Sequence, residues 1–203
     1  MTSVAILLFQ GCDAMDVVGP YEVFLTASRL AGRAGEATPF TVATVSLDGR
    51  AVTAYGGLGL VPDGGALGAV DHDVLVVPGL IDLDAGLADE ALVAGIAQAS
   101  HRVAVTTSVC TGSFLLHAAG VLGDRPATTH FEDVALLAGR RGPSAVTPAD
   151  VRWVDDGSVV TSGGLSSGIA MALHLVERMA SMALATATAR QLDYIWAAQR
   201  EAP

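Results

Sequence analysis

Three short runs of apolar and β-branched residues most constrain how this chain can fold. They are Val4–Phe9, Asp73–Val77 and Val103–Val109. A strand with one wet face alternates apolar and polar residues, whereas a strand covered on both faces is almost continuously apolar. Segments with helical periodicity separate these runs. The pattern therefore predicts a parallel sheet with helices packed against both of its faces.

The remaining segments predict the other elements. Helices are expected at Met15–Ala31, Asp89–Ala99, Thr111–Gly120, Leu165–Met182 and Thr186–Ala198. Further strands are expected at Phe40–Ser46, Ala127–Thr129, Val151–Val154 and Val159–Thr161, with a small hairpin from Ala51–Ala54 and Leu58–Val61. We find no linker or internal repeat. Residues 1–203 are thus predicted to form one α/β domain, a three-layer αβα sandwich around a mostly parallel, doubly wound sheet.

Composition restricts the partners and the compartment. Hydrophobic residues make up 51% of the chain and charged residues 16%, which suits strands buried on both faces. The net charge of −10 disfavours nucleic acid and anionic membranes as partners. Two cysteines, Cys12 and Cys110, are too few for a disulfide framework, and the N-terminus does not resemble a signal peptide. We expect a cytoplasmic protein with reduced thiols.

Cys110 stands where a predicted strand runs directly into a helix. Its neighbours Ser108, Thr111 and Gly112 are small enough for a sharp turn. Such an elbow presents its side chain at the carboxyl end of the sheet, where open α/β folds bind ligands. The helix N-terminus is expected to favour the thiolate and lower the pKa of Cys110. We predict a nucleophile, although a lone cysteine is also commonly a buried structural residue.

Four other segments could contribute to the same site. Asp16 follows the first strand and could serve in acid–base chemistry or cap the helix. Gly79 and Leu80 follow a central strand, where a turn can direct backbone N–H groups at negative charge. His130 could contact the thiol or cap the following helix. The Gly-rich residues 161–168 lack the lysine of a phosphate loop and suit close strand–helix packing. No spacing indicates a metal site.

Taken in order, these segments resemble the ThiJ/PfpI family of the class I glutamine-amidotransferase-like superfamily. The resemblance covers nearly the whole chain. Four segments are similar in particular to the branch that holds isonitrile hydratase and the ligand domains of AraC-type regulators: Asp16–Phe24, Ser108–Gly112, Ala127–His130 and Ser166–Leu173. The resemblance implies a flavodoxin-like fold, a homodimer, a small-molecule substrate, and no metal or organic cofactor.

The resemblance also implies roles for individual residues. Cys110 would be the nucleophile or acid–base thiol, Asp16 would supply or accept a proton, and Thr111 would offer its backbone N–H and hydroxyl to the substrate. The residues expected to bind the substrate or stabilise an anion are Gly19, Gly79, Leu80, Gly112 and His130.

Two departures from the family pattern bear on specificity. Leu80 stands where the family often has a second glycine, which would narrow the pocket. Thr111 follows Cys110 where protease-like members have histidine, so a Cys–His peptidase is not expected.

The leading functional hypothesis is hydration of an isonitrile to an N-substituted formamide. Protonation makes the isonitrile carbon electrophilic, and either Cys110 or a water activated by Asp16 would attack it. The alternatives are glyoxalase or deglycase chemistry on small reactive aldehydes, and ligand or redox sensing without catalysis. Fold alone does not distinguish these.

Overall fold

The predicted aliphatic runs form the centre of a six-stranded sheet. The structure is a computed structural model and describes residues 1–196. The strands lie in the order β2 (Phe40–Ser46), β1 (Thr2–Leu8), β5 (Val74–Val77), β6 (Val105–Ser108), β8 (Val159–Ser162) and β7 (Trp153–Asp155). All neighbours pair in parallel except β7, which is antiparallel to β8. The predicted doubly wound α/β fold is confirmed.

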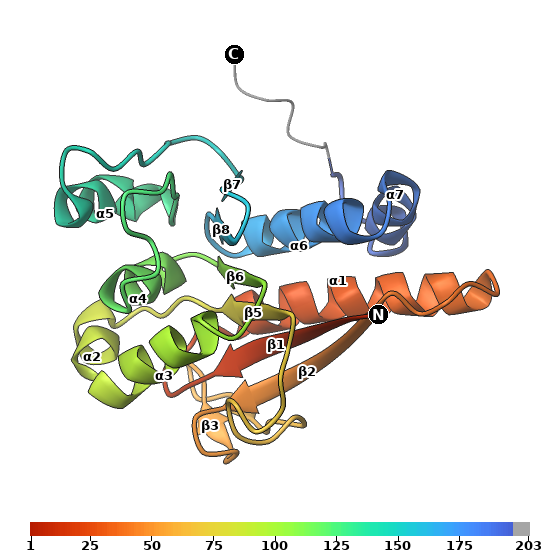
Figure 1. Cartoon of the computed structure of the whole chain (residues 1–203), viewed down its shortest axis with the longest axis horizontal. Helices are drawn as coiled ribbons and strands as arrows, with labels where there is room; N and C mark the ends of the chain where they lie inside the picture. The colour runs from red at the N-terminus through yellow and green to blue at the C-terminus, as the bar shows by residue number, and fades with distance from the viewer. Residues whose placement is uncertain (197–203) are drawn as a thin grey trace.

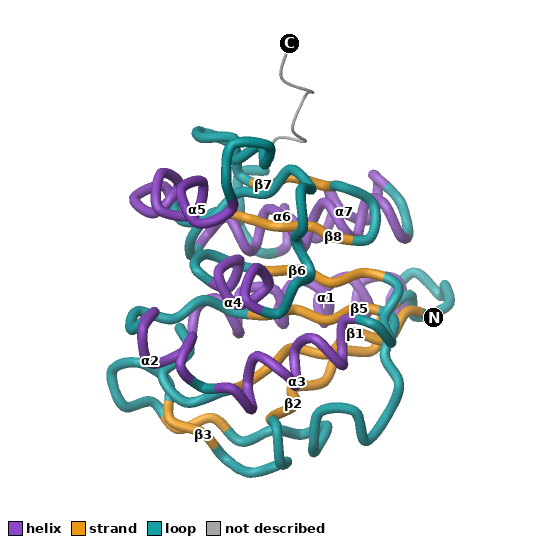
Figure 2. The backbone as a smooth tube through the Cα atoms, turned by 60° about the vertical axis from the view of Figure 1, so that its left-hand side comes forward, coloured by secondary structure: helices purple, strands orange, loops and turns teal. Residues whose placement is uncertain are grey.

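Helices cover both faces of the sheet (Figures 1 and 2). One layer contains α1 (Ala14–Arg33), α6 (Ser166–Met179) and α7 (Met182–Gln191), which pack against one another. The other contains α2 (Leu83–Ala88), α3 (Glu90–Ser100) and α4 (Gly112–Ala118). A 3-10 turn η1 (Phe131–Asp133) and helix α5 (Val134–Arg141) follow. In residues 1–196, no helix has the length and apolarity needed to cross a bilayer.

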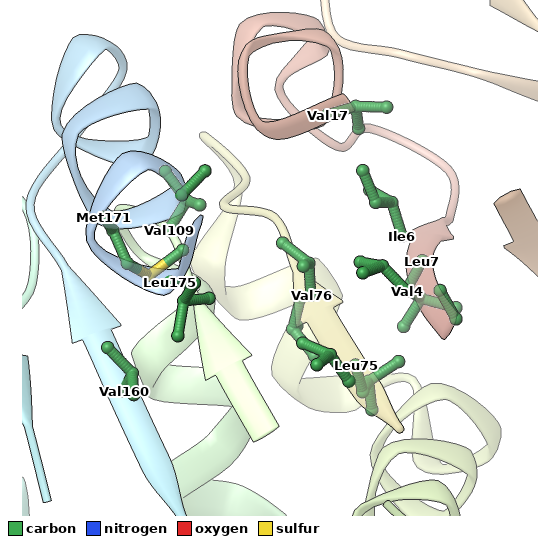
Figure 3. Packing of buried hydrophobic residues seen from close by; sticks show 14 of the residues in the cluster. Val4, Ile6, Leu7, Val17, Leu75, Val76, Val109, Val160, Met171 and Leu175 are labelled. Atoms are coloured by element: carbon green, nitrogen blue, oxygen red, sulfur yellow. The ribbon is translucent and has the colours of Figure 1, made fainter. Parts of the chain in front are cut away.

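The hydrophobic core lies between each helical layer and the sheet (Figure 3). Ile6 of β1 and Val76 of β5 are fully buried in the middle of the sheet. Met171 and Leu175 of α6 pack over the sheet from one side and are also fully buried. Burial on both faces explains why these strands have no alternating pattern.

The predicted small hairpin is also present, outside the main sheet. Its strands are β3 (Val52–Thr53) and β4 (Gly59–Leu60), which pair antiparallel.

The segment Ala127–Thr129, predicted as a strand, is not one. Its backbone N–H groups bind partners outside any ladder: Ala127 donates to the carbonyl of Val146, and Thr128 donates to the Thr161 hydroxyl at 2.8 Å. The Thr129 hydroxyl donates to the carbonyl of Cys110 at 3.0 Å. Side-chain hydrogen bonds therefore hold this buried segment in place of strand pairing.

The two C-terminal helices differ from their predicted bounds. The helix expected over Leu165–Met182 ends at Met179, and Ser181 begins α7 by accepting a hydrogen bond from the Leu184 N–H at 3.1 Å. Helix α7 starts earlier than the predicted Thr186. Helix α7 ends at Gln191, so the predicted continuation through residues 192–196 is wrong, and the predicted end at Ala198 lies outside the described residues.

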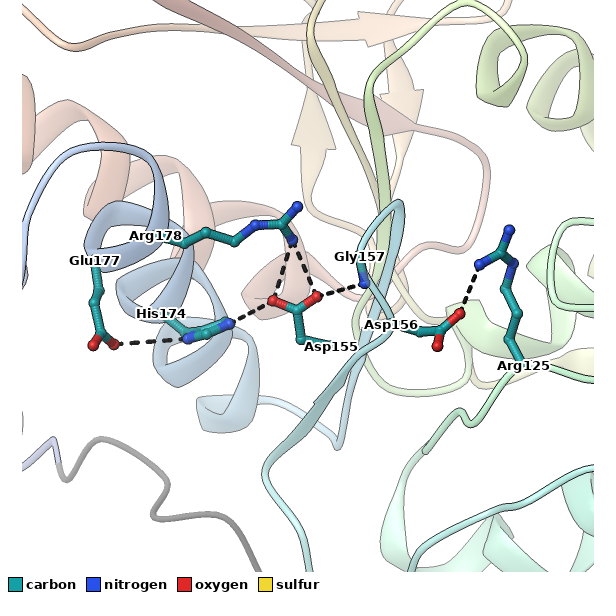
Figure 4. A network of polar contacts seen from close by, with 7 residues as sticks. All are labelled: Arg125, Asp155, Asp156, Gly157, His174, Glu177 and Arg178. Atoms are coloured by element: carbon teal, nitrogen blue, oxygen red, sulfur yellow. Dashed lines mark hydrogen bonds and ion pairs between the residues drawn. The ribbon is translucent and has the colours of Figure 1, made fainter.

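A polar network joins α6 to the hairpin of β7 and β8 (Figure 4). Asp155 accepts hydrogen bonds from Arg178 at 3.1 Å, and its carboxylate lies 2.7 Å from Nε2 of His174. Both partners belong to α6, and the hydrogen bond with His174 contributes to a lowered pKa of Asp155, although burial opposes it. The network fixes the position of α6, whose first residues follow the loop beside Cys110.

Candidate active site

Cys110 occupies a strained backbone position between β6 and α4. Its φ of 56° is uncommon for a residue other than glycine. The Cys110 N–H donates to the carbonyls of both Ser162 and Gly163, each at 3.1 Å. Gly112 passes so close to the preceding loop that a Cβ there would lie 2.5 Å from the Val77 carbonyl. Neighbouring backbone thus holds a conformation that presents the thiol at the strand end.

Asp16 lies completely buried beside this elbow, on α1. One carboxylate oxygen accepts the Gly79 N–H at 3.0 Å and the other accepts the Leu165 N–H at 3.2 Å. The helix-cap role that the sequence also allowed belongs to Asp13, which accepts the Met15 N–H at 2.9 Å. Burial raises the pKa of Asp16 to about 7, despite the hydrogen bond from Gly79 that lowers it. Asp16 can therefore hold or release a proton near neutral pH.

Gly79 is the point where three functional side chains converge. A Cβ on Gly79 would lie 2.7 Å from Oδ2 of Asp16, 2.8 Å from Cβ of Cys110 and 2.8 Å from Oγ1 of Thr111. Only glycine leaves room for this close approach of the backbone to the Asp16 carboxylate and to Cβ of Cys110.

The electrostatics of Cys110 differ from the prediction of a stabilised thiolate. Burial raises the pKa of Cys110 to about 12, and the negative charge of Asp16 adds to the increase. Hydrogen bonds from Thr111 act in the opposite direction but are outweighed. The physical reason is that Cys110 is only 9% exposed and α4 spans seven residues. This environment favours the thiol form of Cys110 over the thiolate.

The predicted anion-binding N–H groups of Gly79 and Leu80 are both occupied. Gly79 donates to Asp16, and Leu80 donates to the hydroxyl of Thr111 at 2.8 Å. The Thr111 hydroxyl in turn donates to the Leu80 carbonyl at 2.6 Å, so its proton is not directed at a substrate. The expected anion-stabilising pocket is therefore closed by internal partners in this structure.

A cavity of about 250 Å³ opens in front of the thiol. Its lining residues are Asp13, Leu80, Ile81, Leu83, Cys110, Thr111, His130, Glu132, Asp133 and Leu165. Gly19, which was expected in this pocket, lies instead between α1 and α6, where a Cβ would meet Ile169 at 3.0 Å. It lines a different cavity, together with Ile169 of α6, because this part of α1 packs against α6.

His130 lies next to the thiol, across Gly164. A Cβ at Gly164 would lie 3.2 Å from Nε2 of His130 and 3.3 Å from Sγ of Cys110. The other ring nitrogen, Nδ1, faces Glu132 at 3.7 Å and Asp133 at 3.8 Å. His130 makes no side-chain capping hydrogen bond to η1, so the thiol-facing placement is the one observed.

Comparison with known proteins identifies the family of this chain. Residues 2–178 match the DJ-1/PfpI family. The chain belongs to the DJ-1/PfpI family. A ThiJ/PfpI family protein from Pseudomonas syringae has a similar solved structure, with a TM-score of 0.81 and 28% identity. The match covers 98% of this chain and 78% of that one.

Two curated relatives have different activities. The isonitrile hydratase of Pseudomonas putida is 31% identical over 191 residues, which are 94% of this chain and 78% of that protein. The HTH-type transcriptional regulator GbdR of Pseudomonas aeruginosa is 28% identical over 95% of this chain. This DJ-1/PfpI chain spans 50% of the length of that regulator.

Sequence reasoning placed residues 161–168 beside the DJ-1/PfpI site but assigned no role to its individual residues. Leu165 has a φ of 51° and gives its N–H to Asp16 from 149 positions away. Gly164 forms the wall shared by Cys110 and His130. The paired glycines before the last long helix were a usable signal for Gly164. The acidic residues Glu132 and Asp133 carried a weaker signal, because they come two and three positions after His130.

Proposed function

We propose that this DJ-1/PfpI protein hydrates isonitriles to N-substituted formamides. The observation that carries the proposal is the convergence of Cys110 and the Asp16 carboxyl on Gly79, next to a cavity that Cys110 lines. The similarity to the Pseudomonas putida isonitrile hydratase over 94% of the chain supports it.

In the first step, the thiol adds to the isonitrile carbon. Asp16, in its ionised form, accepts the Cys110 proton and delivers it to the lone pair of that carbon. The sulfur then forms a bond to the same carbon, and one π pair moves to nitrogen. The product is a thioformimidate, R–N=CH–S–Cys110. A carboxyl with a pKa of about 7 suits both halves of this transfer at neutral pH.

In the second step, water releases the product. Water adds to the thioformimidate carbon, and Asp16 relays the departing proton to nitrogen. The tetrahedral adduct then expels the Cys110 sulfur, which receives the hydroxyl proton as the C–S bond breaks. The products are R–NH–CHO and the original thiol, so the atoms of one water are incorporated. No redox change occurs.

The occupied N–H groups favour this chemistry over reactions that form an oxyanion. Acyl transfer and thiol addition to aldehydes both place negative charge on an oxygen, which donors must stabilise. The N–H groups of Gly79 and Leu80 already donate to Asp16 and Thr111. During isonitrile hydration, charge develops on carbon and nitrogen, where Asp16 can deliver a proton.

The test is formamide production from cyclohexyl isocyanide by the purified protein. Cys110→Ser and Asp16→Asn should each lose nearly all turnover. Asp89→Asn is the matched control, because Asp89 is an exposed carboxylate that caps α3 outside the cavity. Unchanged turnover in Cys110→Ser would rule out the covalent route. No turnover by the wild type would remove the proposal.

Ligand sensing without turnover is the second candidate. The raised pKa of Cys110 favours it, because a thiol that stays protonated is a weak nucleophile. The similarity to GbdR over 95% of the chain also supports it. Tight, saturable binding of an isonitrile without formamide release would favour sensing over catalysis.

A further inference from the structure

The cavity in front of Cys110 is lined by both apolar and acidic side chains. Leu80, Ile81, Leu83 and Leu165 supply the apolar surface. The acidic side chains are Asp13, Glu132 and Asp133. Among the described residues, the ten that line this cavity include no arginine or lysine. The cavity therefore suits a molecule with an apolar body and a positive charge.

We propose that this site selects isonitriles that carry a protonated amine, and discriminates against those that carry a carboxylate. This inference rests on the proposed function for its substrate class. Its electrostatic part depends only on the residues around the thiol.

The negative charge of the cavity is not neutralised by its neighbours. Glu132 and Asp133 have His130 as their ion-pair partner among the described residues. Asp13 accepts a backbone N–H, which leaves its charge in place. A protonated His130 would balance only one of these three carboxylates. Asp16, behind them, adds further negative charge whenever it is ionised.

The carboxylates are placed where they can act on a substrate at the thiol. His130 separates Cys110 from Glu132 and Asp133: its Nε2 side faces the sulfur across Gly164, and its Nδ1 faces both carboxylates within 3.8 Å. An amine on a substrate that reacts at the thiol would therefore lie in the cavity that these carboxylates also line. Asp133 is the stronger candidate of the pair, because its side chain is 29% exposed whereas that of Glu132 is 71% exposed.

The first experiment compares three isonitriles of similar length and different charge. The probes are 3-(dimethylamino)propyl isocyanide, pentyl isocyanide and 4-isocyanobutanoate. We expect kcat/KM to fall in that order at low salt, with roughly tenfold or more between the cation and the anion. The preference should shrink as ionic strength rises, because salt screens partly exposed charges. Equal values for the three probes, or the anion as the best substrate, would overturn the inference.

Variants identify the residues that set the preference. Asp133→Asn should reduce the cation-to-anion ratio most, and Glu132→Gln should reduce it less. Glu36→Gln is the matched control. Glu36 is exposed in the loop before β2, at the edge of the sheet where the strands begin, whereas the cavity lies at the edge where they end. A ratio that is the same in all three variants would contradict the assignment.

A second readout separates this inference from the proposed function. Cys110 is modified in a Cys12→Ser background with methanethiosulfonate reagents bearing trimethylammonium, methyl or sulfonate groups. We expect the cationic reagent to react fastest relative to its rate with free thiol. If the cationic reagent reacts fastest but the protein hydrates no isonitrile, the charge preference stands and the proposed function is wrong. If the protein hydrates isonitriles but the three reagents show no dependence on charge, the proposed function stands and the charge preference is wrong.

Discussion

The hydroxyl of Thr111 makes two hydrogen bonds with the backbone of Leu80. It accepts the Leu80 N–H at 2.8 Å and donates to the Leu80 carbonyl at 2.6 Å. Both residues are buried, and they come from different loops at the carboxyl edge of the sheet. The pair fixes the loop after β5 against the elbow that carries Cys110. It also determines that Leu80 cannot offer its N–H to a substrate.

Replacing Thr111 tests this structural role. Thr111→Val keeps the shape but leaves a buried N–H and a buried carbonyl of Leu80 without partners. We expect a loss of about 1–3 kcal/mol in the free energy of unfolding, measured in urea. Thr111→Ser retains a hydroxyl and should stay close to the wild type. A Thr111→Val protein as stable as the wild type would show that the two hydrogen bonds do not stabilise the fold, and a larger loss in Thr111→Ser would assign the effect to packing of the methyl group.

Gly79→Ala should disrupt the site directly. The new Cβ would lie under 3.0 Å from Asp16, Cys110 and Thr111, so these groups must move. We expect a destabilisation of about 1–3 kcal/mol and a large loss of turnover. Gly32→Ala is the control, because no atom lies within 4 Å of its Cβ position and it is helical. That variant should gain about 0.5–1 kcal/mol. Thermal unfolding and formamide release measure both variants.

The pKa of Asp16 predicts how stability depends on pH. Its pKa is raised to about 7 in the folded protein, so the folded state binds a proton that the unfolded chain has released. The contribution of Asp16 to the free energy of unfolding is therefore fully present at low pH and is lost as the pH rises through about 7. Between pH 5.5 and 8 we expect the wild type to lose about 2 kcal/mol relative to Asp16→Asn. Urea unfolding of both proteins at several pH values measures the difference. Parallel curves would show that Asp16 ionises normally.

The exposed face of α1 offers a surface for the homodimer that the family resemblance implies. Met15, Val18 and Leu25 are each more than 40% exposed and follow a helical spacing on that face. We propose that two copies associate through this surface. Val18→Asp should then shift the protein from dimer to monomer in light scattering. Val70→Asp, at an exposed position outside α1, should not. A monomeric wild type would contradict the proposal.

The fold was predictable because each central strand has a continuous apolar sequence, and that alone indicates that the strand is buried on both faces. Val4–Phe9 and Asp73–Val77 needed no information from the rest of the chain. The segment Ala127–Thr129 was predicted wrongly because its hydrogen bonds go to side chains such as Thr161, which a local pattern does not reveal.

The site was predictable only in part. The elbow at Cys110 follows from small neighbours along the sequence, and its location at the strand end agrees with the prediction. The hydrogen bond from the Leu165 N–H to the Asp16 carboxylate joins residues 149 positions apart, so no local pattern predicts it. Whether the pKa of Cys110 is raised or lowered depends on which effect is larger: burial, which raises it, or the helix N-terminus, which lowers it. The sequence does not show how deeply a single thiol is buried. The roles of these residues in catalysis stay predictions.

The raised pKa of Cys110 predicts slow, pH-dependent modification of the thiol. Because the pKa is about 12, only a small fraction is thiolate at neutral pH. The rate of reaction with iodoacetamide should rise about tenfold per pH unit from pH 7 to 9. Asp16→Asn should react faster at each pH, since the charge of Asp16 contributes to the raised pKa. Mass spectrometry in a Cys12→Ser background follows the modification, with Cys110→Ser as the blank. A rate that is constant from pH 6 to 9 would show that Cys110 is already a thiolate, and the helix N-terminus would then outweigh burial.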